Sequence, residues 1–184
     1  MKRRVLLLTG APGIGKTTIL ARTGELLKSE GYSVGGMISR EVRVKQNRVG
    51  FEIIDVTSSN RNWLAHVDQK IGPQVGRYRV NISGLEATGV PAVLNAVQKA
   101  DVVFIDEVGP MELFSSRFKD AVRKAVESEK PVIAIVHWRA ADPFIGTMKE
   151  RGDSEIFVAS ITNRDELPET LSKKVIKYVK YIAA

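Results

Sequence analysis

The stretch Gly10-Ala11-Pro12-Gly13-Ile14-Gly15-Lys16-Thr17 decides the fold of this chain. It fits the pattern G-x-x-x-x-G-K-[ST] at every fixed position. The apolar residues 5–8 before it are typical of a buried strand, and residues 18–30 after it have the periodicity of a helix that ends at Gly31. Strand, glycine-rich turn and helix are the context of a phosphate-binding loop, so we prefer this interpretation to a chance glycine-rich turn.

Each part of the loop has a chemical use. The glycines let the backbone bend and approach an anion, so that the amides of residues 13–18 surround phosphate oxygens. The N-terminus of the following helix adds partial positive charge. We expect Lys16 to reach the β- and γ-phosphates and the Thr17 hydroxyl to bind Mg²⁺. The residues predicted to bind nucleotide here are Gly10, Ala11, Pro12, Gly13, Ile14, Gly15, Lys16, Thr17 and Thr18.

A second motif lies in the middle of the chain, where the apolar residues 102–105 are followed by Asp106 and Glu107. At the carboxyl end of a parallel strand, Asp106 would lie beside the phosphate loop and hold Mg²⁺, directly or through water, opposite Thr17. Glu107 would orient or deprotonate a water molecule near the γ-phosphate. The alternatives are a strand that meets a polar loop and, for Glu107, a structural pair with an arginine.

Composition limits the classes of protein. The 184 residues, 43% hydrophobic and 27% charged, are typical of one soluble globular domain, residues 1–184. No apolar run approaches the roughly 18 residues of a membrane span, and the run near the start is too short for a signal peptide. We therefore expect a cytoplasmic protein without membrane contact, and a monomer.

The chain has no cysteine, which excludes disulfides, thiolate catalysis and cysteine zinc sites. His66 and His137 form no metal-spacing pattern, so Mg²⁺ is the only metal expected. The net charge of +7 is compatible with a nucleic-acid partner. However, the basic residues are spread along the chain, no RNA-binding aromatic motif occurs, and a positive field also suits a protein that binds nucleotides.

Strands alternate with helices along most of the sequence. We predict strands at residues 32–38, 101–106, 131–136 and 156–158, and helices beginning near Pro91, at Ser115 or Ser116, at Asp142 and at Asp165. Such alternation predicts an α/β fold with a mainly parallel central sheet and helices on both faces, the three-layer sandwich of P-loop NTPases.

An insert follows the second strand. Residues 39–44 and 49–56 are predicted to form a small β-hairpin around a turn at residues 45–48. Residues 63–67 are expected to form one short helical turn, and residues 78–82 a short strand.

Other side chains are candidates for contact with the ligand. A second cation at the γ-phosphate would come from Arg40, Arg43, Arg117, Arg139, Arg151 or Arg164, with a solvated surface position as the alternative for each. Arg117 and Arg139 are expected just beyond strands, on the edge where open α/β sheets bind ligands. Near the C-terminus, Asn163 is predicted to bond a base edge and Arg164 to stack on the base, unless their loop only caps a helix. No N-K-x-D motif selects guanine, so strict GTP specificity is not expected.

Taken together, these motifs resemble the THEP1 family of nucleoside-triphosphatases over nearly the whole chain. Besides the loop, the resemblance is carried by Ser39-Arg40-Glu41-Val42-Arg43, Gly50-Phe51-Glu52-Ile53, Gly76-Arg77-Tyr78-Arg79-Val80-Asn81, Ile105-Asp106-Glu107-Val108-Gly109, Met111-Glu112-Leu113-Phe114-Ser115 and Asn163-Arg164-Asp165. It implies Mg²⁺-dependent, slow hydrolysis of ATP, GTP, CTP and UTP to diphosphate and phosphate.

The resemblance also implies a second nucleotide-binding stretch. This stretch comprises Val102, Val103, Phe104, Ile105, Asp106, Glu107, Val108 and Gly109. Pro110 stands where the family often has lysine, so that position is assigned no role.

Two other functions remain open. A small-molecule or nucleotide kinase would use the same scaffold, with an acceptor pocket in the insert between residues 43 and 82. A nucleotide-dependent regulator that binds nucleic acid would use the positive charge, and would show salt-sensitive affinity for polyanions.

Overall fold

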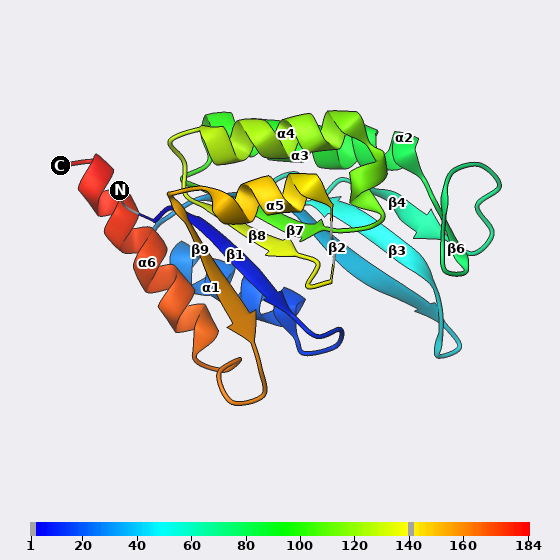
Figure 1. The fold of residues 1–184 in the computed structure, drawn as a ribbon, viewed down its shortest axis with the longest axis horizontal. Helices are drawn as coiled ribbons and strands as arrows, with labels where there is room; N and C mark the ends of the chain where they lie inside the picture. Colours follow the sequence, from blue (N-terminus) through cyan, green and yellow to red (C-terminus); the bar gives the residue numbers. More distant parts are fainter. Residues whose placement is uncertain (1–2, 140–141) are drawn as a thin grey trace.

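The structure is a computed structural model that describes residues 3–139 and 142–184. The described residues contain a nine-stranded sheet with the strand order β5-β6-β4-β3-β2-β7-β8-β1-β9 (Figure 1). Its strands are β1 (Val5–Gly10), β2 (Val34–Val44), β3 (Asn47–Asp55), β4 (Arg61–His66), β5 (Gln74–Val75), β6 (Tyr78–Val80), β7 (Val102–Val108), β8 (Val132–Val136) and β9 (Ser154–Ala159). The helices are α1 (Lys16–Ser29), α2 (Ile82–Gly84), α3 (Val90–Lys99), α4 (Ser116–Glu127), α5 (Pro143–Glu150) and α6 (Leu167–Ile182), with a π-helical turn η1 (Leu85–Gly89) and a 3₁₀ turn η2 (Glu112–Phe114).

Five neighbouring strands, β2, β7, β8, β1 and β9, run parallel. Every residue of β1 is buried, because this strand has neighbours on both edges and helices on both faces. Helices α3, α4 and α5 cover one face, and α1 and α6 cover the other (Figure 1). The predicted α/β fold, with helices on both faces of the sheet, is confirmed.

The insert is larger than the predicted hairpin. Strand β2 begins parallel to β7 at Val34 and continues past it to pair antiparallel with β3 as far as Val44. Strands β4, β6 and β5 then extend the same sheet, each antiparallel to its neighbour. The hairpin of β2 and β3 is thus the first part of an antiparallel extension, which reaches away from the parallel half (Figure 1).

The short helical turn predicted at residues 63–67 is wrong, because residues 63–66 lie in strand β4. Ala65 stands opposite Phe51 of β3 and opposite Val80 of β6, so the backbone of β4 is paired on both sides. Leu64 and Ala65 are buried. Such a short apolar segment has no decisive period, and strand pairing with distant residues determines its conformation.

Helix boundaries depend on local capping. Ser115, rather than Ser116, caps α4, since its Oγ accepts a hydrogen bond from the Phe118 N–H at 3.0 Å. Asp142 caps α5 in the predicted way. The helix predicted to start near Pro91 instead begins with α2, because the Asn81 side chain accepts from the Gly84 N–H and the chain runs through η1 into α3. Pro91 is tolerated there because it lies in the first turn of α3.

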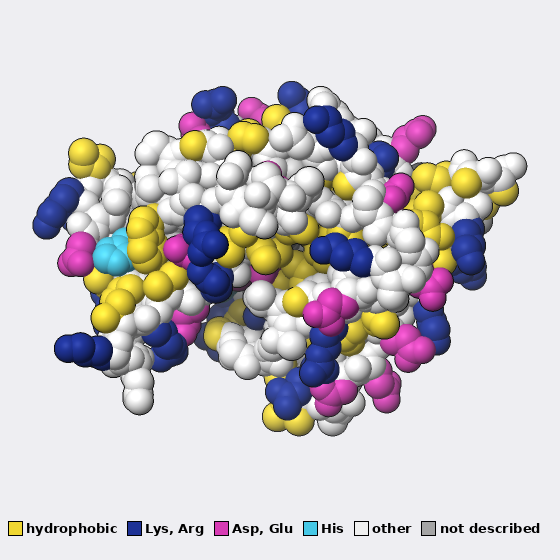
Figure 2. Space-filling model, turned by 180° about the vertical axis from the view of Figure 1, so that it is seen from behind, with side chains coloured by type: hydrophobic (Ala, Val, Ile, Leu, Met, Phe, Trp, Pro, Cys, Tyr) yellow, Lys and Arg dark blue, Asp and Glu magenta, His cyan; other side chains and the backbone are white. Residues whose placement is uncertain are grey.

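The surface carries charges of both signs. On the face drawn in Figure 2, lysine and arginine side chains are interspersed with aspartate and glutamate, and hydrophobic side chains border a hollow near its middle. This face shows no single basic patch of the kind expected for a nucleic-acid binding surface. Among the described residues, no helix combines the length and the apolar character that crossing a bilayer requires.

Candidate active site

The phosphate loop connects β1 to α1. Gly13 and Gly15 have φ angles of +77° and +102°, in the left-handed region that favours glycine. The Lys16 ammonium donates to the carbonyl oxygens of Gly10 at 2.9 Å and Ala11 at 3.1 Å. The lysine therefore lies over the loop, next to the free N–H groups of the first turn of α1, where a phosphate would bind.

Asp106 lies in β7 with its side chain only 2% exposed. Burial raises its pKa to about 7; hydrogen bonds from the Thr17 hydroxyl and the Ser39 backbone N–H oppose this rise, and the charge of Glu107 adds to it. Its Oδ2 atom has no hydrogen-bond partner within the described part of the chain. A buried carboxylate oxygen of this kind, beside a threonine hydroxyl, fits a divalent cation.

Thr17 and Asp106 suit Mg²⁺ better than they suit a metal whose ligands all come from the protein. No group of three or more His, Cys, Asp or Glu side chains arranged for a metal occurs in residues 3–139 and 142–184. Mg²⁺ usually uses one or two carboxylates and completes its shell with water and substrate phosphates. Thr17 and Asp106 therefore fit that ion only together with a phosphate ligand.

Glu107 follows Asp106 and faces the same cleft. Burial raises the pKa of Glu107, and the neighbouring charges of His137 and Lys16 lower it less. Within the described residues Glu107 has no ion pair with an arginine, the alternative raised by the sequence. The cleft has a volume of about 550 Å³, and Lys16, Thr17, Asp106, Glu107, His137 and Trp138 lie on its walls. The structure thus brings the predicted catalytic and metal residues together.

The other residues of the second stretch predicted to bind nucleotide, residues 102–109, support the two acids from within the sheet or directly after it. Val102, Val103, Phe104, Ile105 and Val108 are buried in the sheet and its cores, away from the cleft. Gly109 donates its backbone N–H to the Glu112 carboxylate at 3.1 Å. Only Asp106 and Glu107 of this stretch line the cleft, so the other residues position these two acids.

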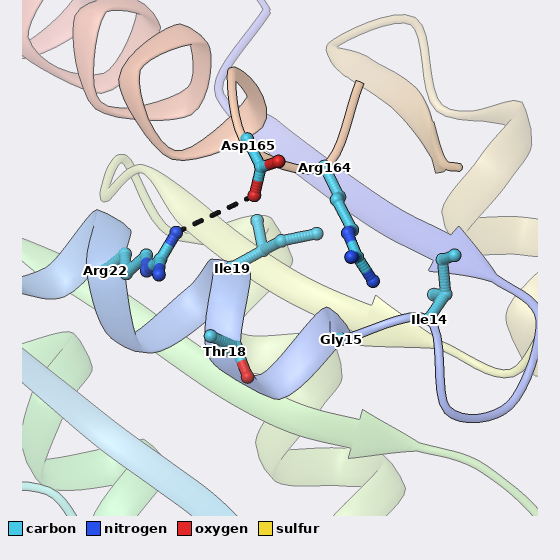
Figure 3. A pocket seen from close by; sticks show the side chains of 7 residues that line it. All are labelled: Ile14, Gly15, Thr18, Ile19, Arg22, Arg164 and Asp165. Carbon is cyan, nitrogen blue, oxygen red and sulfur yellow. Dashed lines mark ion pairs between the residues drawn. The ribbon is translucent and has the colours of Figure 1, made fainter. Parts of the chain in front are cut away.

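A smaller pocket of about 190 Å³ lies on the other side of the phosphate loop, where Ile14, Gly15, Thr18 and Ile19 form part of the wall (Figure 3). Arg164 extends across it from the loop after β9 toward the phosphate loop (Figure 3). The pocket therefore offers a guanidinium plane beside the phosphate site.

Asn163 is engaged within its own loop. Its Oδ1 accepts from the Ser160 N–H at 2.8 Å, and its Nδ2 donates to the Val158 carbonyl at 2.9 Å. Both ends of the amide are occupied, which corresponds to the structural alternative for Asn163 and leaves Arg164 as the residue of this loop that faces the pocket. Asp165 does not begin α6, which starts at Leu167; it pairs with Arg22 at 3.8 Å instead.

The other arginine candidates are placed differently. Arg40 lines the cleft and pairs with Glu52 at 2.6 Å. Arg117 lies in the first turn of α4, not beyond a strand, and pairs with Glu86 at 3.4 Å. The remaining partners are Glu41 for Arg43, the Trp138 ring for Arg139 and Asp153 for Arg151. Arg40 is thus the candidate of this group that lies on the wall beside Lys16.

The NTPase family model matches residues 5–172 of this sequence. Nucleoside-triphosphatase THEP1 of Thermofilum pendens is 46% identical over 180 residues, which are 97% of this chain and 99% of the relative. The chain belongs to the THEP1 family of nucleoside-triphosphatases. The Methanopyrus kandleri protein of the same name is 42% identical over 95% of this chain and 97% of its own length.

Solved THEP1-like structures agree with the fold. The crystal structure of THEP1 from the hyperthermophile Aquifex aeolicus aligns with a TM-score of 0.83 at 29% identity, covering 93% of this chain and 98% of that one. A human cancer-related nucleoside triphosphatase, solved in solution, aligns with a TM-score of 0.81 at 31% identity, covering 95% and 98%.

Sequence reasoning missed several residues of this THEP1 site. Arg22 belongs to no recognised pattern, and Asp165 only to the segment Asn163-Arg164-Asp165 of the resemblance, so no local signal indicated that these two exposed side chains meet. Glu112 is only 5% exposed, and burial together with the charges of Glu107 and Asp106 raises its pKa to about 8. The acid in Met111-Glu112-Leu113 was visible as part of the resemblance, but its position beside Glu107 depends on the turn η2.

Proposed function

We propose that this protein hydrolyses nucleoside triphosphates to diphosphate and phosphate in the presence of Mg²⁺, with broad tolerance of the base. The observation that supports this most directly is the convergence of Lys16, Thr17, Asp106 and Glu107 on one cleft at the phosphate loop. The names of the relatives, nucleoside-triphosphatase THEP1, agree with it.

Different residues of the cleft serve different parts of phosphoryl transfer. The loop amides and the N-terminus of α1 bind the β- and γ-phosphates, and Lys16 exchanges its hydrogen bonds to Gly10 and Ala11 for the phosphate oxygens. Thr17 and Asp106 would hold Mg²⁺, which neutralises charge on the phosphates when bound. Glu107 orients the attacking water and accepts its proton, and its raised pKa brings it nearer to neutral pH, where a base works best.

Base tolerance follows from the pocket beside the loop. Arg164 offers a flat cation on which any base can stack, and stacking is insensitive to sequence because every base has a π face. Arg22 and Asp165 are largely exposed, with 58% and 79% of their side chains accessible, so any hydrogen bond that Arg22 donates to a base edge, or that Asp165 accepts from one, competes with water. The site therefore binds the base mainly through stacking on the face of the base ring, and less through hydrogen bonds to its edge.

The experiment is phosphate release from ATP, GTP, CTP and UTP with Mg²⁺ and no other acceptor. We expect slow release from all four by the wild type. Lys16→Ala should lower the rate by at least about 100-fold, because the cation at the γ-phosphate is lost. Lys28→Ala, at the other end of the same helix α1, serves as the matched control and should keep the wild-type rate. Equal rates for both variants would refute the mechanism.

A further inference from the structure

A second cavity adjoins the cleft, on the side of the antiparallel extension. Its volume is about 270 Å³, and we call it the insert cavity. It shares Ser39, Phe51, Glu107 and His137 with the nucleotide cleft. Because Glu107 belongs to both walls, the two spaces meet at the carboxylate that faces the γ-phosphate.

The walls of the insert cavity are mostly apolar and come from the extension. Phe51 of β3, Leu64 of β4 and Val75 of β5 face Met111 from the segment after β7. The ring of Phe51 is held by an edge contact with the Tyr78 ring, at 5.2 Å between centroids. This wall is therefore formed without a ligand, as is usual for small-molecule sites.

The polar residues of the insert cavity are few, and most of them lie at its border with the cleft. Ser39, Glu107 and His137 line both spaces, whereas Glu112 lines the insert cavity alone. The buried Nδ1 of His137 has no hydrogen-bond partner among the described residues. An apolar cavity with a few convergent polar groups is the usual form of a small-molecule site. Attack by water on a phosphate needs none of this apolar wall.

The charges of the residues that line the insert cavity limit which molecules can bind there. No lysine or arginine of the described residues lines the insert cavity, whereas two acids, Glu107 and Glu112, do. A phosphorylated molecule or a second nucleotide would meet repulsion there and find no cation. A neutral molecule with an apolar body and one hydroxyl group matches both the walls and the border. A cavity of about 150 Å³ already holds benzene, so one ring fits in this larger space.

We propose that the insert cavity binds a compact neutral alcohol, whose hydroxyl group competes with water for the γ-phosphoryl group. The alcohol oxygen forms a bond to the γ-phosphorus while the bond from that phosphorus to the β–γ bridging oxygen breaks. The nucleoside diphosphate leaves, and the hydroxyl proton passes to the Glu107 carboxylate. The products are an organic phosphate and a diphosphate. This inference rests on the proposed hydrolase site, which supplies the nucleotide and the base.

The test uses benzyl alcohol as the probe. Wild-type protein is incubated with ATP, Mg²⁺ and benzyl alcohol, and ³¹P NMR measures benzyl phosphate against inorganic phosphate. Binding beside the γ-phosphate should raise the benzyl phosphate share at least about tenfold above the share set by the concentrations of alcohol and water. A share at or below that ratio would overturn the acceptor role.

A pair of variants assigns the effect to the insert cavity. Val75→Trp fills it from the short strand β5, and Val75→Ala leaves it open; Val75 does not line the nucleotide cleft. We expect Val75→Trp to lose benzyl phosphate but keep phosphate release within about twofold, because water still reaches Glu107. Val75→Ala should keep both products. Equal benzyl phosphate in the two variants would overturn the assignment.

Binding is measured separately, without nucleotide. Benzyl alcohol should shift the methyl NMR signal of Met111, which lines the insert cavity, and not that of Met148, which is a buried residue of helix α5. An unshifted Met111 signal would overturn the site. If the wild type releases no phosphate from ATP even without alcohol, the proposed hydrolase fails, whereas the Met111 shift still decides whether the cavity binds the alcohol.

Discussion

Glu107→Gln is the substitution that most directly tests the chemistry of the cleft. Glutamine has nearly the same shape and keeps the contacts of the side chain, but it cannot accept a proton from water. General-base catalysis contributes about 10²- to 10⁴-fold to a rate, so kcat should fall by that factor, equivalent to about 3–5 kcal/mol of activation free energy.

Nucleotide binding should respond differently from turnover. The charge of Glu107 contributes to the raised pKa of the buried Asp106. Removing that charge makes Asp106 easier to ionise, which favours Mg²⁺ and nucleotide. We therefore expect Glu107→Gln to bind nucleotide as tightly as the wild type or more tightly, while its turnover is almost lost.

The assay is single-turnover phosphate release at saturating ATP and Mg²⁺, with binding followed by titration of a fluorescent nucleotide. Glu41→Gln is the matched control, since this acid also lines the cleft but is engaged with Arg43 and Arg48. Exposed ion pairs contribute about 1 kcal/mol or less, so the control should change turnover by less than about fivefold. A similar small loss in Glu107→Gln, or a loss of binding equal to the loss of turnover, would refute the assignment of Glu107 as the base.

Three further expectations follow from other parts of the structure. Arg164→Ala should raise KM for ATP, GTP, CTP and UTP alike, by about 5- to 150-fold, because base stacking contributes about 1–3 kcal/mol; a selective effect on one base in steady-state assays would contradict stacking. The pKa values of Asp106 and Glu112, about 7 and about 8, lie above those of unfolded carboxyl groups, so the folded protein holds more protons between about pH 4 and 8. The free energy of unfolding without ligand should therefore fall as pH rises through that window, and urea midpoints that stay level or rise would contradict these pKa values. Ser115→Ala should destabilise the fold by about 1–2 kcal/mol in urea denaturation, because its hydroxyl caps α4 and also donates to Glu86, whereas Ser116→Ala should cost less than about 0.5 kcal/mol.

The phosphate loop and the two acids of β7 could be predicted because their signals are local. In the loop, the glycines, Lys16 and Thr17 are neighbours in sequence, and the backbone geometry that they require is set within a few residues. Asp106 and Glu107 end a continuous apolar run, and such runs are buried in parallel sheets. Since ligands of open α/β sheets bind beyond the carboxyl ends of strands, the meeting of these two motifs also followed from the sequence.

Contacts between distant segments were decided only in the tertiary structure. Residues 63–66 form part of a strand because β3 and β6 complete their backbone hydrogen bonds, and nothing within that segment indicates these partners. The insert cavity exists because β3, β4 and β5 face the segment after β7, and the pair of Arg22 with Asp165 joins α1 to the loop before α6. Hydrophobic periodicity and motif spacing predict the conformation of a segment and the face that it buries. They do not predict which distant side chains pack on that face, because this depends on how strands pair and helices pack.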